Sequence, residues 1–457
     1  MGIKNSKAIK ILREKGIFKS LKYAYIKRSW KIMMQYYKIL WICNKKIPNN
    51  YNGILLYNGV SGGQALSLFL ERSADILTPN PWSPQYHKNI SNYYGAQYYN
   101  AAQKTHSKLI IYGNPGHGCY TDKELSKFFS LTNARVPVII LLRDPISRIK
   151  GYVNHGVDWW EHRSNEFTLM HDPSKILNRV SYHGDKIETQ RKFPSPESIK
   201  HFFTINDIFL CFSLVEKLPN ASEIIYMDMS EITKDRVWHT MNDLSEKLSL
   251  PKPQLKDKPF FESTIWDSSS KMLPLTLYAH PKHIGRRLSP ECSILYYQVY
   301  KRDHIIDEAG EGGIRLIISK DSNLNNKKSI FNDMKDSKDL LKDITQEILC
   351  DIAQSDIYIY ISYGDYAILQ GNASLQNACK EYMREFLLAL DERVKIESSH
   401  LVNEEQVLEY LKENMDLSIK LKEIFDYEFQ DVCKLRPDIV SSWKYYKQFQ
   451  DILTNNK

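Results

Sequence analysis

The sequence predicts an α/β fold with a doubly wound parallel sheet, followed by a mostly helical C-terminal region. Two observations support this fold class. Between residues 53 and 251, short apolar runs alternate with helical segments, which is typical of parallel strands buried on both faces. The composition, with 42% hydrophobic and 25% charged residues among 457, is that of an ordinary globular protein with a sizeable core.

The first predicted strand, Gly53–Tyr57, leads into a glycine-containing loop at 58–63 and a helical segment at Gln64–Arg72. In such a strand–loop–helix unit, free backbone N–H groups and the helix dipole can hold phosphate. The loop is not a Walker A sequence, because the GK[ST] ending is missing. It is interpreted either as a P-loop-like phosphate site or as a simple tight turn.

The second predicted strand is Lys108–Tyr112, and the helix after it spans 122–130. Thr121 and Glu124 have the spacing of a capping box, which favours a helix that begins at residue 122.

The third predicted strand, Val136–Leu142, is the most apolar. Asp144 suits the N-cap of the helix that follows, and Pro145 suits its first position. A fourth strand at Glu223–Met227 precedes a helix at about 233–248. These strands complete the predicted parallel sheet.

Polar or glycine-rich segments follow three of these strands, at 58–63, 113–119 and 143–155. Ligands of doubly wound sheets bind beyond the carboxyl ends of the strands, so these segments form the candidate site. The third reads RDPISRIKGYVNH and places Arg143 at the strand tip. Over roughly 53–252, the chain resembles the sulfotransferases, which use 3′-phosphoadenylyl sulfate (PAPS) as donor.

The resemblance implies which residues bind the donor. The loop after the first strand would hold the 5′-phosphosulfate, and Arg143 would hold the 3′-phosphate. His117, after the second strand, would be the general base that deprotonates the acceptor hydroxyl. A loop histidine bonded to backbone is the alternative for His117, and glycan-directed relatives often use a Glu. The full set of donor-site candidates is Gly59, Ser61, Gly62, Gly63, Gln64, Arg143, Lys150 and Gly151.

The sequence departs from the sulfotransferase pattern at three positions. Ser61 stands where the loop usually carries a Lys that neutralises the bridging oxygen, and Gln64 replaces a usual Thr. Gly151 replaces a Ser that is the second ligand of the 3′-phosphate. Lys150 either supplies the missing charge or is solvated. The departures leave open a donor other than PAPS.

The C-terminal third adds two predicted strands, at Ile314–Ser319 and Ile357–Ser362, with a helix at about 337–353 between them. Helical patterns follow at 374–396 and 404–452. The ending RPDIV-x-SWKYY resembles a bacterial family of unknown function, some of whose members are labelled sugar transferases and are associated with surface polysaccharides. A packed terminal helix is the structural alternative for this motif.

Together, these features predict an enzyme that transfers a sulfuryl or similar small charged group. The donor would be PAPS or another nucleotide-activated compound, and the acceptor a sugar hydroxyl of a bacterial surface glycan. One alternative is a phosphoryl-type or sugar-nucleotide transferase of capsule or lipooligosaccharide synthesis. The other is a catalytically inactive binding module.

Basic residues are concentrated in the N-terminal arm. Residues 1–46 carry thirteen Lys or Arg and one acid, Glu14, whereas the remaining residues sum to −4. The body therefore lacks the basic balance of a nucleic-acid-binding domain. The arm is predicted to be an amphipathic helix that either contacts a membrane peripherally or packs on the body.

The predicted organisation is a basic arm at 1–50, a sulfotransferase-like domain at 51–260 and an α-rich region at 261–457. The seven cysteines are scattered without a CxxC pair, which predicts a reducing compartment and no metal site. We expect the protein to be cytoplasmic, including the inner face of the membrane.

Overall fold

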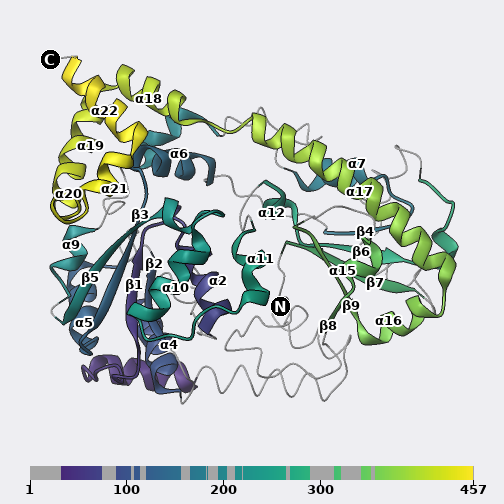
Figure 1. Ribbon diagram of the computed structural model, residues 1–457, viewed down its shortest axis with the longest axis horizontal. Coiled ribbons are helices and arrows are strands. Elements are labelled where there is room, and N and C mark those ends of the chain that lie inside the picture. The colour runs from purple at the N-terminus through teal and green to yellow at the C-terminus, as the bar shows by residue number, and fades with distance from the viewer. Residues whose placement is uncertain are drawn as a thin grey trace, which may run out of the picture.

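The computed structural model describes residues 32–74, 89–103, 108–113, 120–155, 165–181, 183, 194–202, 211–218, 220–263, 268–288, 313–320, 341–350 and 356–455. Figure 1 shows two sheets side by side, with a run of helices along one edge of the molecule. Within the described residues, no helix combines the length and the apolar composition that a bilayer crossing requires.

The first sheet has four parallel strands in the order β2-β1-β3-β5, which confirms the predicted parallel α/β architecture. The strands are β1 (Gly53–Tyr57), β2 (Leu109–Gly113), β3 (Val136–Leu142) and β5 (Ala221–Asp228). The chain passes from β1 to β2 on one side and then to β3 on the other. The topological switch point, where doubly wound sheets bind ligands, therefore lies between β1 and β3.

Helices cover both faces of this sheet because side chains of each strand alternate between two cores. Ile54 and Leu56 of β1 join one core, and Leu55 and Tyr57 join the other. The first core includes residues of α4 (Ile90–Ala102), α5 (Asp122–Leu131) and α6 (Pro145–His155), and the second those of α2 (Gly63–Ala74) and α10 (Val237–Lys247). The predicted capping box of Thr121 and Glu124 is present at the start of α5.

The second sheet is mixed, with the order β4-β6-β7-β9-β8. Only β4 and β6 pair in parallel; the other pairs are antiparallel. Its strands are β4 (Glu166–Thr168), β6 (Leu275–Ala279), β7 (Ile314–Ser319), β8 (Leu341–Asp343) and β9 (Tyr358–Ser362). The predicted helix at 337–353 is wrong at 341–343, because these residues pair with β9.

Helices pack on the second sheet around a separate core. The longest is α17 (Ala373–Ser399), whose buried side chains include Phe386, stacked on Phe167 of β4. The others near it are α7 (Pro173–Val180), α12 (Ser268–Met272), α15 (Thr345–Ile348) and α16 (Tyr363–Gln370). The remaining short helices are α8 (Ile199–Phe202), α9 (Phe212–Val215) and α11 (Lys258–Phe261), with 3₁₀ turns at η1 (Pro196–Ser198), η2 (Met229–Ile232), η3 (Leu255–Asp257) and η4 (Pro281–His283).

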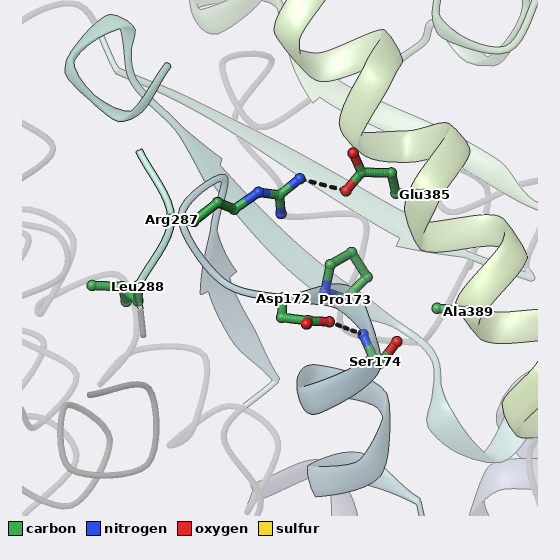
Figure 2. A pocket seen from close by; sticks show the side chains of 7 residues that line it. All are labelled: Asp172, Pro173, Ser174, Arg287, Leu288, Glu385 and Ala389. Carbon is green, nitrogen blue, oxygen red and sulfur yellow. Dashed lines mark hydrogen bonds and ion pairs between the residues drawn. The ribbon is translucent and has the colours of Figure 1, made fainter. Parts of the chain in front are cut away.

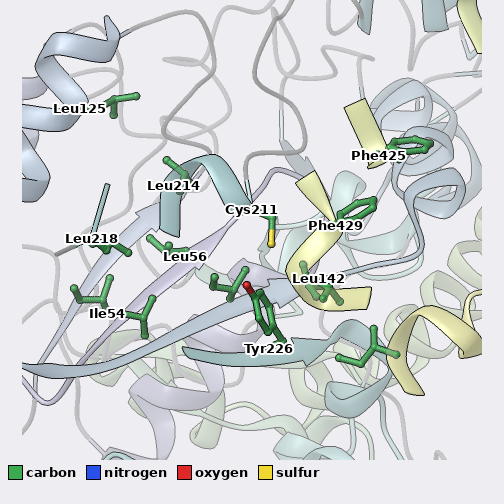
Figure 3. Close-up of a cluster of buried hydrophobic side chains, with 14 of the residues drawn as sticks. Ile54, Leu56, Leu125, Leu142, Cys211, Leu214, Leu218, Tyr226, Phe425 and Phe429 are labelled. Carbon is green, nitrogen blue, oxygen red and sulfur yellow. The ribbon is translucent and has the colours of Figure 1, made fainter. Parts of the chain in front are cut away.

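The last five helices return to the first sheet. They are α18 (Glu404–Glu413), α19 (Met415–Glu428), α20 (Gln430–Leu435), α21 (Pro437–Ser442) and α22 (Lys444–Asn455). Figure 3 shows Phe425 of α19 and Phe429, which joins α19 to α20, in the same region as Leu142 of β3 and Tyr226 of β5. All four belong to one buried cluster. The C-terminal region is therefore mostly helical, as predicted, and completes the core of the first sheet.

Two carboxylates hold the C-terminal signature against this sheet. Asp144, after β3, accepts hydrogen bonds from the backbone N–H groups of Ile146 and Ser147 at the start of α6. Its second oxygen accepts from the N–H groups of Tyr445 and Tyr446 at the start of α22. Burial raises the pKa of Asp144, and these donors oppose that rise.

Asp228, at the end of β5, accepts a 2.8 Å hydrogen bond from the indole Nε1 of Trp443. Arg436 donates to the backbone oxygen of Tyr226 at 2.6 Å and pairs with Asp438. The motif RPDIV-x-SWKYY therefore docks on the carboxyl ends of β3 and β5. This outcome agrees with the structural alternative of a packed terminal helix.

Asp144→Ala removes the caps of two helices, so we expect it to lower the free energy of unfolding by about 2–3 kcal/mol. The matched control is Asp172→Ala. Asp172 is exposed and caps α7 alone through the N–H of Ser174, and its loss should cost about 1 kcal/mol. Denaturant titration measures both values. Equal losses for the two variants would show that the α22 cap contributes nothing.

Candidate functional site

The candidate site lies at the carboxyl ends of β1 and β3, around the loop between β1 and α2. Val60 and Gly62 both have a positive φ, at 58° and 91°, so the backbone turns sharply here. Ser61 is buried, and its hydroxyl donates a 2.6 Å hydrogen bond to the backbone oxygen of Asn58. The Ser61 side chain therefore stabilises the loop itself.

Gly63 opens α2 in close contact with the preceding strand. A Cβ atom at this position would lie 2.0 Å from the ring of Tyr57, so a side chain cannot fit without displacing that ring. Gln64, the next residue, is exposed in the first turn of α2. The loop thus places its own backbone and the exposed Gln64 side chain at the switch point between β1 and β3.

Two arginines bind this loop from the segment after β3. Arg143 donates from Nη1 to the backbone oxygen of Val60 at 2.8 Å, and Arg148 donates from Nε to that of Gly59 at 3.0 Å. The structure therefore brings Arg143 together with the glycine loop. Arg148 was not among the predicted site residues, although it lies three residues before Gly151 on the same helix.

Both arginines are poorly solvated. Burial lowers the pKa of Arg148, and the nearby positive charge of Arg143 lowers it further. Burial also lowers the pKa of Arg143, against the opposing effect of the carboxylates of Glu404, Asp144 and Asp228. The two guanidinium groups therefore add positive charge beside the loop, and the three carboxylates offset part of that charge at Arg143.

Gly151 lets α6 approach the loop closely. A Cβ atom there would lie 3.3 Å from Nη1 of Arg143 and 3.4 Å from Cβ of Val60. A Cβ at this position would be tight against the Arg143 guanidinium and in ordinary van der Waals contact with Val60. The missing side chain at Gly151 thus leaves room for the Arg143 guanidinium beside the loop.

Lys150, the other basic residue predicted in the donor site, binds a carboxylate and not the glycine loop. Its Nζ lies 3.0 Å from a carboxylate oxygen of Glu404 at the start of α18, and the same carboxylate accepts a hydrogen bond from Ser147. Lys150 therefore links α6 to α18, whereas Arg148 is the residue of α6 that contacts the loop.

His117 lies outside the described residues, so its role as general base stays a prediction. The described part of β2 ends at Gly113, which is opposite Tyr57 in the register of the sheet. Among the described residues, no group of three or more His, Cys, Asp or Glu side chains is placed to hold a metal ion.

The helices that pack on the first sheet form with it the first lobe, and those that pack on the second sheet form the second lobe. A separate hollow of about 400 Å³ lies on the second lobe, between α7 and α17. Figure 2 shows Arg287 paired with Glu385 there, and Asp172 bonded to the N–H of Ser174. None of the predicted site residues lines it. Because two carboxylates oppose its one arginine, the hollow does not suit a phosphate group.

The comparisons with known proteins concern the C-terminal half. The family model described as "Protein of unknown function (DUF2972)" matches residues 226–455. No curated protein and no solved structure matches the chain. The chain therefore belongs to this family of unknown function, as its terminal motif predicts.

Gly63→Ala should lower the free energy of unfolding by about 3 kcal/mol, because its Cβ overlaps the buried ring of Tyr57. Gly364→Ala in α16 is the control: its Cβ would meet nothing closer than 3.9 Å. We expect that control to change stability by less than about 1 kcal/mol, in the stabilising direction. Thermal or urea unfolding gives both values, and a neutral Gly63→Ala would argue against the tight strand–helix contact.

Proposed function

We propose that this member of the DUF2972 family is a transferase that uses a nucleotide-activated donor. The donor's phosphates would lie at the carboxyl ends of β1 and β3. A small charged group such as sulfuryl would pass to a sugar hydroxyl of a bacterial surface glycan. The observation that carries the proposal is the 2.8 Å hydrogen bond between Arg143 and the glycine loop, at the switch point of the sheet.

Two features of the described residues support anion binding at this place. The loop precedes the N-terminus of α2, where the helix dipole favours negative charge. Arg143 and Arg148 add two positive charges with reduced access to water. A phosphate group there would raise the lowered pKa of each guanidinium and stabilise the buried pair.

In the proposed reaction, His117 takes the proton of the acceptor hydroxyl. The hydroxyl oxygen forms a bond to the sulfur or phosphorus of the transferred group. The bond from that atom to the bridging oxygen breaks in line, and the nucleotide leaves with the bond's electron pair. Arg143 would stabilise the charge on the nucleotide phosphates.

A phosphoryl-type or sugar-nucleotide donor is the second candidate, and two contacts favour it. In the resembling sulfotransferases, a lysine at the loop neutralises the bridging oxygen. Here the Ser61 hydroxyl is engaged by Asn58, and the Lys150 ammonium is engaged by Glu404. Because both side chains already bind other groups, these contacts do not direct either of them to the bridging oxygen.

Nucleotide binding tests the donor site. We expect one member of a panel of adenosine 3′,5′-bisphosphate, ADP, CDP, CMP, UDP and GDP to raise the melting temperature of the wild-type protein. At 100 times the dissociation constant, the stabilisation is about 2.7 kcal/mol. Arg143→Ala should abolish the shift, because it removes a cation from the site.

Arg135→Ala is the matched control for that measurement. Arg135 is exposed and directly precedes the first residue of β3, at the end of the strand away from the candidate site. A shift with the bisphosphate alone supports a PAPS-type donor, and a shift with a cytidine or uridine nucleotide supports the second candidate. No shift with any nucleotide, or equal loss in both variants, would reject the donor site and favour a binding module.

His117→Ala tests the catalytic role. With the donor class identified by that panel, the variant should keep its nucleotide-induced melting shift and lose at least about 100-fold in the rate of group transfer. His239→Ala, an exposed histidine of α10 paired with Asp243, is the control and should keep the rate. Unchanged transfer in His117→Ala would place the base elsewhere in the chain.

A further inference from the structure

The helix at 32–42 has two apolar faces, and one of them packs on the body. Met34 and Tyr37 are buried on this inner face. The ring of Tyr37 lies 5.9 Å from that of Tyr98 of α4, and the ring of Trp41 lies 5.4 Å from that of Tyr94. These contacts hold the helix on the first lobe.

The outer face of the same helix is also apolar, and it is exposed. The exposed fractions are 63% for Ile32, 53% for Tyr36, 57% for Ile39 and 71% for Ile42. Spacings of four, three and three residues put these side chains in one row along the helix. Single exposed apolar residues are ordinary, but a continuous row on a firmly packed helix indicates a binding surface.

Positive charge accompanies this row. Lys45 and Lys46 are exposed directly after the helix, and Lys38 is half-buried within it. In the sequence, the first 46 residues sum to +12, whereas the rest of the chain sums to −4. The partner that fits must therefore combine an apolar layer with negative charge, which is the chemistry of an anionic lipid surface.

We propose that the outer face, formed by Ile32, Tyr36, Ile39 and Ile42, docks on the surface of an anionic bilayer. The isoleucines would enter the boundary between head groups and acyl chains, with the tyrosine ring at the level of the head groups. The lysines would contact lipid phosphates. None of these residues belongs to the candidate donor site, so the inference stands independently of the proposed transferase activity.

Vesicle co-sedimentation of the full chain tests the proposal. The wild-type protein should bind phosphatidylcholine vesicles that contain about 30% phosphatidylglycerol, and bind pure phosphatidylcholine vesicles more weakly. The double variant Ile39→Asp/Ile42→Asp should bind the anionic vesicles at least about tenfold more weakly. Both positions are exposed, so the substitutions should leave folding intact.

Leu388→Asp is the matched control, because Leu388 is 73% exposed on α17 of the other lobe. It should bind vesicles as the wild type does. Absence of wild-type binding, or full binding by the double variant, would overturn the proposal. If light scattering shows a wild-type dimer that the double variant lacks, with vesicle binding unchanged, the surface binds a second copy of the chain instead.

Discussion

The carboxylate of Asp144 holds together parts of the chain that are far apart in sequence, and the candidate site depends on it. One oxygen receives the first N–H groups of α6, and the other receives those of α22. Arg143 directly precedes this residue, so the capping contacts hold the backbone beside the one from which its guanidinium reaches the oxygen of Val60. The same edge is closed by Trp443, which donates to Asp228 at the end of the neighbouring strand. The carboxyl edge of the sheet is thus shaped by residues of the terminal helices as well as by its own loops.

This arrangement gives the terminal motif a structural meaning. The family model begins at residue 226, within β5, and ends at 455, within α22. It therefore includes Asp228, Arg436 and Trp443, which join the terminal helices to the sheet. The glycine loop and Arg143 lie before the matched region. The matched region therefore contains the residues that cover the carboxyl edge of the first sheet. The proposed donor chemistry rests instead on the geometry at β1 and β3, outside that region.

The sequence predicted those parts of the fold that depend on local pattern. The strands β1, β3 and β7 span the predicted residues, because a buried strand must be a continuous or alternating apolar run. The short strands β4, β6 and β8 were missed. Residues 341–343 were expected in a helix and instead form a strand through pairing with β9, which no local pattern contains. The partner of Lys150 could not be predicted either, since Glu404 is distant in sequence and reaches it only through the docking of α18.

The two arginines act on the loop through its peptide planes. In a trans peptide, the carbonyl and the following N–H point in opposite directions. Because the carbonyl of Gly59 accepts from Arg148, the N–H of Val60 points away from that guanidinium. The carbonyl of Val60 accepts from Arg143 in the same way, and this orients the N–H of Ser61. That N–H donates a hydrogen bond to the backbone oxygen of Asn58. The guanidinium groups thus have two effects that add: they place positive charge at the switch point, and they orient the backbone N–H groups of the loop.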